Sequence, residues 1–127
     1  MTRIYSSFAV LLAVSTVGGC DAPTPGFGNG AVSRHSVEGS DFTVYVTGDI
    51  AESVRTNPQF APRIGPLAGR GAIAMQMASG CRVTQLAGDA AVLVGRLNCG
   101  GRAAPACEVE AVLKGRRGIS LPVVRHC

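Results

Sequence analysis

An uncharged apolar run near the start of the chain decides how much of the sequence is left to form a domain. The run extends from Phe8 to Val17 and follows a single early cation, Arg3. At about 1.5 Å per residue its length is about 15 Å, half of the roughly 30 Å hydrocarbon core of a bilayer, so the run is too short for a permanent spanning helix. A cation followed by a short apolar stretch is typical of an export signal that is removed after secretion.

The residues after this run indicate how the exported chain is held. Val17-Gly18-Gly19-Cys20 resembles the lipobox of bacterial lipoproteins, which has a branched aliphatic residue, two small residues and a cysteine. Gly18 is a mild departure, because the family more often has Ala, Ser or Thr there. The resemblance implies a diacylglyceryl thioether on Cys20, cleavage before Cys20 and a further acyl chain on the new amino terminus. Several acyl chains together make a lasting membrane anchor. The alternative is an ordinary secretory signal followed by a coincidental cysteine.

The rest of the chain divides into a tether and one domain. Removal of residues 1–19 leaves 108 of the 127 residues, with 11 basic and 8 acidic side chains and a net charge of +3. Residues 20–41 are rich in Gly, Pro, Ser and Ala and lack apolar periodicity, which predicts a lipidated cysteine and a flexible tether in which His35 is solvated. Residues 42–127 then form the domain. The chain has no Trp, two Tyr and four Phe, so its core must be built from small aliphatic side chains.

The first part of this domain shows one strand pattern and two helix patterns. Residues 42–47 alternate apolar and polar side chains, which predicts a strand. Asp49, with Glu52 three residues later, predicts a short capped helical turn that ends before Asn57-Pro58. A longer helix is expected over residues 66–79, because Pro66 suits a first helical position and Gly80 suits the position after the last turn. The residues expected on its packing side are Leu67, Gly71, Ala74, Met75 and Ala78.

The second part predicts four strands in a meander, near residues 81–86, 90–98, 107–114 and 118–125. Burial of odd-numbered positions sets the registers, with turns at 87–89 and 115–117. Pro122 cannot donate a ladder hydrogen bond, so the last strand should lie at a sheet edge. The fold class is therefore α+β, in the order β-α-β-β-β-β, with a mostly antiparallel sheet and one helix on one face. The residues expected to be buried in the strands are Cys81, Val83, Leu93, Leu97, Cys99, Val109, Ala111, Leu113, Ile119, Leu121 and Val123.

Four of the five cysteines lie in these strands, and export to an oxidising compartment predicts two disulfides. A bond between Cys81 and Cys127 would span three inter-strand gaps of about 4.8 Å, beyond the roughly 7 Å Cα limit of a disulfide. Pairing of alternate strands also overreaches. We therefore expect Cys81–Cys99 and Cys107–Cys127. In the predicted register Cys99 lies beyond the residue opposite Cys81, so this strand would have to curl back.

Catalytic and metal-binding patterns are weak. Cys99, Cys107, His126 and Cys127 have zinc-ligand chemistry, but their spacing does not suit one ion. A thiol nucleophile with His126 as its base requires a free Cys127, and a serine nucleophile lacks a Gly-x-Ser-x-Gly elbow. Glu108 and Glu110 share a strand face, where they form either a carboxylate pair or a solvated surface. We expect no metal and no cofactor.

A basic turn is the remaining feature. Lys114, Arg116 and Arg117 surround Gly115, where they could meet anionic lipid head groups or acidic envelope polymers. The alternative is a charged turn that protects an edge hairpin from aggregation. Nucleic acid is not an expected partner, since the charge is modest and aromatic residues for stacking are few.

These features together predict a bacterial cell-envelope lipoprotein that faces the periplasm or the exterior. We expect a non-catalytic binding or structural module whose partners are the membrane, through its lipid anchor, and an envelope protein or an anionic polymer. The alternatives are a small periplasmic enzyme that uses a thiol or a carboxylate pair, and a surface protein that contacts a host.

Overall fold

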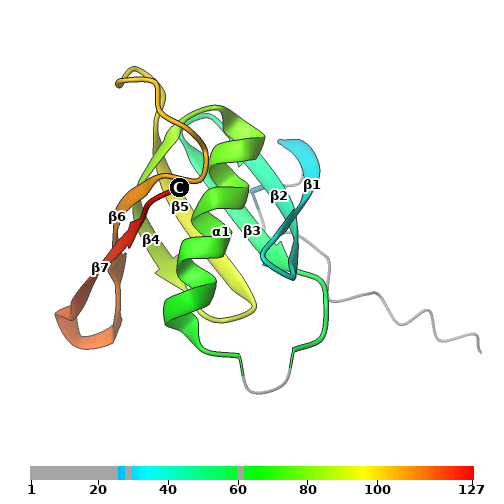
Figure 1. Cartoon of the computed structure of the whole chain (residues 1–127), viewed down its shortest axis with the longest axis vertical. Helices are drawn as coiled ribbons and strands as arrows, with labels where there is room; N and C mark the ends of the chain where they lie inside the picture. The colour runs from blue at the N-terminus through cyan, green and yellow to red at the C-terminus, as the bar shows by residue number, and fades with distance from the viewer. Residues whose placement is uncertain (1–25, 28–29, 60–61) are drawn as a thin grey trace, which may run out of the picture.

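The domain is an α+β fold in which a mostly antiparallel sheet surrounds one helix (Figure 1). The computed structural model describes residues 26–27, 30–59 and 62–127. The fold class and the two disulfides agree with the sequence analysis. The elements are β1 (Ala31–Val37), β2 (Ser40–Thr47), β3 (Ile50–Arg55), α1 (Ile64–Ser79), β4 (Arg82–Gly88), β5 (Val92–Asn98), β6 (Val109–Lys114), the 3₁₀ turn η1 (Arg116–Gly118) and β7 (Ser120–Arg125).

The first strand, β1, is a correction to the tether predicted for residues 20–41. Residues 31–37 pair with β2 along their whole length. Glu38 and Gly39 connect the two strands and both have positive φ, 49° and 82°. Two-residue turns of this kind match the right-handed twist of a hairpin. The tether prediction is therefore wrong from residue 31 onward, and residues 20–25 and 28–29 of it lie outside the described part of the chain.

The third strand, β3, replaces the helical turn predicted from Asp49 and Glu52. Thr47 pairs with Ile50 across a two-residue connection, in which Gly48 has a φ of 58°. Glu52 is fully buried and pairs with Tyr45 on β2, so it does not cap a helix. The capping pattern was misleading because a tight turn and a short helix begin with the same residue types.

The helix α1 ends where the sequence predicted and begins two residues earlier. Gly80 has a left-handed φ of 70°, and its N–H donates to Gln76 O at 2.9 Å. Pro66 is the third helical residue rather than the first. The first N–H groups of a helix have no intrahelical partner, so proline is tolerated at this position as well.

The strand order is β1-β2-β3-β5-β4-β6-β7, which is not the predicted meander of the last four strands. β4 lies between β5 and β6, and β4 and β6 are parallel. The segment from Cys99 to Glu108 therefore passes the end of β4 before β6 begins. This connection has ten residues and contains Gly, Ala and Pro, so it is long enough to skip a strand, whereas the other connections between strands, apart from the one that contains α1, are short. β7 lies at the edge of the sheet, as Pro122 predicted.

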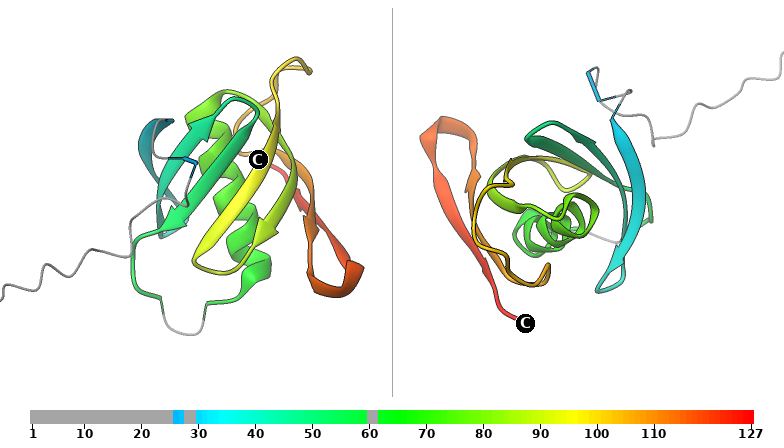
Figure 2. Two further views of the ribbon diagram at one scale, coloured as in Figure 1. Left: turned by 180° about the vertical axis from the view of Figure 1, so that it is seen from behind. Right: turned by 90° about the horizontal axis from the view of Figure 1, so that it is seen from above.

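The sheet curls around α1, so the helix contacts all seven strands (Figure 2, right). The sequence pattern predicts a single packing side for this helix. The buried residues in fact lie around most of its circumference, and they are Leu67, Ala68, Gly69, Gly71, Ala72, Ile73, Ala74, Met75 and Gln76. Most of these side chains are small, because the strands approach the helix from several directions.

Two glycines show how close this approach is. A Cβ on Gly71 would lie 2.7 Å from Leu93 Cδ1 and 3.0 Å from Ser53 Oγ. A Cβ on Gly95 of β5 would lie 2.5 Å from the sulfur of Met75. The helix and the sheet therefore meet at positions where no side chain fits between them.

The registers of the last four strands differ from prediction by a few residues. Val83 pairs with Leu97, and a bulge between Val83 and Gln85 then turns Leu86 toward the core. The β4–β5 turn is at residues 89–91 instead of 87–89. In the last hairpin Leu121 pairs with Leu113, but Leu121 and Ile119 are 51% and 58% exposed, so the prediction that they are buried is wrong. Cys99 is also exposed and Cys81 is only half-buried, contrary to the predicted burial of both.

Glu38 joins the two ends of the curled sheet. Its carboxylate accepts hydrogen bonds from Arg125 of β7 and from Arg70 of α1, the latter at 3.3 Å. The hydrogen bond from Arg125 makes the largest contribution to lowering the pKa of Glu38, and Arg70 lowers it further. The turn after β1 is thus held against the opposite edge strand.

We predict that Gly71→Ala lowers the free energy of unfolding by about 1–3 kcal/mol, since over-packing of a closed core outweighs the gain of up to about 1 kcal/mol in helix propensity. Gly65→Ala is the matched control in the same helix, because nothing lies within 4 Å of its added Cβ. Urea unfolding of both variants measures the difference. Equal stabilities would show that the helix is not enclosed as described.

Candidate functional site

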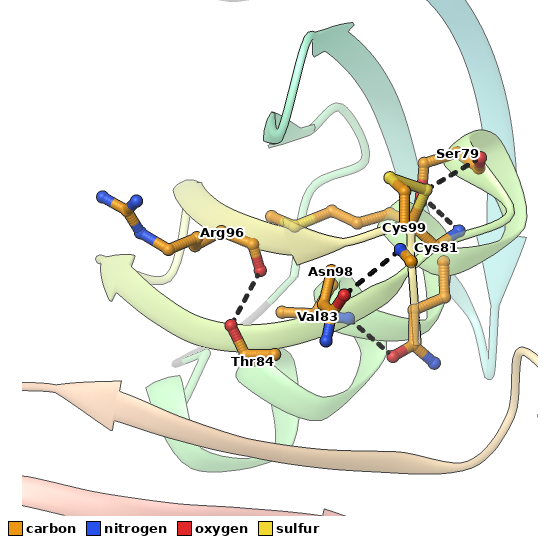
Figure 3. Close-up of a disulfide and its surroundings, with 10 residues drawn as sticks. Ser79, Cys81, Val83, Thr84, Arg96, Asn98 and Cys99 are labelled. Atoms are coloured by element: carbon orange, nitrogen blue, oxygen red, sulfur yellow. Dashed lines mark hydrogen bonds between the residues drawn. A yellow bond between two sulfur atoms is a disulfide. The ribbon is translucent and has the colours of Figure 1, made fainter. Parts of the chain in front are cut away.

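The two disulfides each join directly opposed positions of an antiparallel strand pair. Cys81–Cys99 continues the register of Arg82 with Asn98, and its Cα atoms are 4.5 Å apart (Figure 3). Cys107–Cys127 continues the β6–β7 register, with Cα atoms 5.4 Å apart. The predicted pairing is confirmed. Cys99 does not have to curl back, because the observed register places it opposite Cys81.

Gln76 of α1 links β4 to the segment that enters β6. Its Nε2 donates to Ala106 O and to Glu108 O, both at 2.8 Å, and its Oε1 accepts from Val83 N at 3.0 Å. β4 and β6 pair directly only from Gln85 onward. One buried amide therefore takes the place of strand pairing where the two parallel strands separate.

A polar cleft of about 440 Å³ opens where β4 and β6 separate. We call it the β4–β6 cleft, and its polar or charged lining residues are Arg82, Thr84, Asn98, Arg102, Glu108 and Glu110. The connection between Cys99 and Cys107 forms one wall and is tied at both ends by disulfides. Glu108 and Glu110 thus face one cleft, together with two arginines. Sequence parity predicted that the two carboxylates share a face, but it could not identify the arginines that line the same cleft.

The basic turn is the tip of the β6–β7 hairpin, which extends beyond the neighbouring strands (Figures 1 and 2). Lys114, Arg116 and Arg117 are all exposed there. Arg116 lies near the β4–β5 turn, where the N–H groups of Val92 and Ala91 donate to Asp89. These hydrogen bonds lower the pKa of the Asp89 carboxyl, and the charge of Arg116 lowers it further.

A serine–histidine contact lies on β1, in the segment that was predicted to be a tether. Ser33 Oγ and His35 Nε2 are 2.8 Å apart. A serine nucleophile also requires a group that orients the histidine. Among the described residues no carboxylate is found hydrogen-bonded to His35, so the contact lacks this element. His126, the other histidine, is exposed near the chain end.

The structure tests the candidate zinc ligands but not the lipidation site. Cys99, Cys107 and Cys127, which had zinc-ligand chemistry, are bonded in disulfides. In the part of the chain that the structure describes, no group of three or more His, Cys, Asp and Glu residues is placed to hold a metal ion. Cys20 lies outside the described residues. None of the described helices has the length and apolar character that crossing a membrane would require.

We predict that the four domain cysteines of the native protein stay unreactive toward a thiol reagent in denaturant until a reductant is added. Replacement of Cys107 and Cys127 together by Ala should lower the free energy of unfolding by about 3 kcal/mol, the entropy estimate for a loop of this length. Thiol titration and urea unfolding measure the two effects. A reactive Cys127 in the native protein would contradict the pairing and would restore the thiol nucleophile.

A second prediction concerns the buried amide. Gln76→Met keeps a similar volume but removes three hydrogen bonds to backbone groups, so we expect a loss of about 2–4 kcal/mol in the free energy of unfolding. Gln85→Met on the exposed side of β4 is the control and should change it by less than about 0.5 kcal/mol. If both variants have the stability of the parent protein in urea, Gln76 does not join the two strands.

Comparison with known proteins identifies no relative: no family model, no curated protein and no solved structure matches this chain. The function therefore has to be argued from the chain's own residues. The features available for that argument are the two disulfides, the β4–β6 cleft and the basic hairpin tip.

Proposed function

We propose that this chain is a lipid-anchored module of the bacterial cell envelope, facing the periplasm or the exterior, and that it acts by binding or as a structural part. The pair of disulfides is the observation that carries the proposal. Both bonds close ends of strand pairs in a small domain. Bonds of this kind persist in oxidising compartments outside the cytosol. The export signal and the lipobox at Cys20 lead to the same compartment.

A non-catalytic role is supported by the way in which the reactive side chains are used. Four thiols are bonded in disulfides, and the Ser33–His35 contact lacks an orienting carboxylate among the described residues. The β4–β6 cleft instead presents charges of both signs around a polar surface. Such a surface suits recognition of a partner with complementary charges, for example an envelope protein.

The second candidate function is a small periplasmic enzyme that uses the carboxylates of Glu108 and Glu110. Their common position in the cleft favours it. General acid–base chemistry would require one carboxyl to be protonated and the other ionised. Arg82 and Arg102 line the same cleft and balance the charge of two carboxylates, so a charged binding surface accounts for all four side chains without this division of roles.

We predict that the mature protein in its native host begins at Cys20 and that this residue carries a diacylglyceryl group. Mass spectrometry of the amino-terminal peptide measures both properties. Cys20→Ser should abolish the lipid and the membrane association, while the domain disulfides still form because they depend on export alone. An unmodified amino terminus that still begins at Met1 would contradict the proposal.

A further inference from the structure

The tip of the β6–β7 hairpin combines cations with exposed apolar side chains. Lys114, Arg116 and Arg117 are exposed, and Ile119 and Leu121 are 58% and 51% exposed. All five residues lie within eight consecutive positions of the chain. We call this group the hairpin tip. Exposed apolar side chains that lie together, rather than singly, mark interaction sites.

Apart from the charge of Arg116, which lowers the pKa of Asp89, the fold makes little use of these side chains. The ion pairs found between described residues join Glu38 to Arg70 and Arg125, and none of them includes a cation of the hairpin tip. Lys114 Nζ donates to Ser120 Oγ at 3.3 Å within the same hairpin. Leu121 pairs with the buried Leu113, yet it remains half exposed because the hairpin extends past the enclosed core (Figure 1).

We propose that the hairpin tip docks on the surface of an anionic lipid bilayer, a proposal that rests on the lipid anchor at Cys20. The three cations are attracted to anionic head groups, and Ile119 and Leu121 enter the boundary between head groups and acyl chains. A soluble acidic polymer would pair with the same cations but would leave both apolar side chains in water. The combination therefore favours a bilayer.

The length of the chain before β1 allows this orientation. Residues 21–26 lie between the lipidated cysteine and Phe27, whose carbonyl accepts a hydrogen bond from Gly30 N at 3.1 Å, so these two residues lie close together. Six extended residues span at most about 21 Å, roughly two thirds of the diameter of a domain whose radius of gyration is near 13 Å. β1 and β7 are at opposite edges of the sheet (Figure 2). The anchor therefore stays at the bilayer when the domain is tilted so that the hairpin tip faces the same surface. Anchoring also keeps the tip at a high local concentration near the lipid, so weak contacts suffice.

A single tryptophan reports directly on this contact, since the chain contains none. The lipidated mature protein with Ile119→Trp is reconstituted into vesicles of phosphatidylcholine alone or with phosphatidylglycerol. We expect a blue shift of the emission and quenching by brominated acyl chains only in the anionic vesicles. About 1 M salt shortens the Debye length to roughly 3 Å and should reverse both effects.

Two variants control the experiment. In the same tryptophan-containing protein, Lys114, Arg116 and Arg117 are changed together to Gln, and each lost cation should weaken docking about fivefold, so that the shift is lost. Val124→Trp places the reporter on β7 away from the tip, at a residue that is 53% exposed, and its emission should not change. All of these positions are on the surface, so each variant is expected to fold, and urea unfolding of each variant checks that it does.

The possible results separate the docking from the anchor. An anchored Ile119→Trp protein whose tryptophan emission is the same in both kinds of vesicle, or shifts equally in both, contradicts the docking and leaves the anchor intact. A protein that carries no lipid and does not sediment with neutral vesicles contradicts the anchor and the docking with it. A shift that survives the loss of all three cations also contradicts recognition of anionic lipid.

Discussion

The close contact between a helix of small residues and a sheet that surrounds it is the constraint on which the other features depend. A chain without Trp has few large side chains with which to fill a core. Here the helix is brought so near that Gly71 meets Leu93 and Gly95 meets Met75, so small aliphatic residues are enough. The sheet has to curl to cover the helix on several sides, and its two edges then approach each other. Because the edges are close, the carboxylate of Glu38, beside edge strand β1, accepts a hydrogen bond from Arg125 of edge strand β7.

The same curvature explains where binding surfaces are available. β4 and β6 are parallel and pair only from Gln85 onward, and the amide of Gln76 satisfies the backbone groups that strand pairing leaves open. The β4–β6 cleft lies at this separation, and the disulfides tie the connection that forms its wall. The β6–β7 hairpin continues past the enclosed helix, so its tip is free to contact a surface. Thus the cleft forms where the pairing of β4 with β6 is interrupted, whereas the tip is the end of a regularly paired hairpin that extends beyond the neighbouring strands.

Local rules predicted the features that need few neighbours. The helix end at Gly80 followed from the tolerance of glycine for a left-handed φ, and the edge position of β7 followed from the missing donor of Pro122. The predicted cysteine pairing is correct, but the argument that excluded Cys81–Cys107 assumed a meander, and in the observed order their strands are neighbours. The same rules failed for β1 and β3, since a Glu-Gly hairpin turn and an Asp that follows a turn glycine look like a tether and a helix cap. They also failed for Ile119 and Leu121, because alternation identifies a strand face but does not show whether the core extends that far.

The amino-acid sequence by itself determined the fold class, the bonded cysteines and the basic character of the turn near Arg116, because each depends on residue type and on short separations along the chain. Only the tertiary structure decided that β4 lies between β5 and β6, that the helix is surrounded, and that Glu108 and Glu110 share a cleft with Arg82 and Arg102. These arrangements bring together residues from distant parts of the chain. Their energies come from packing and burial, which no local pattern contains.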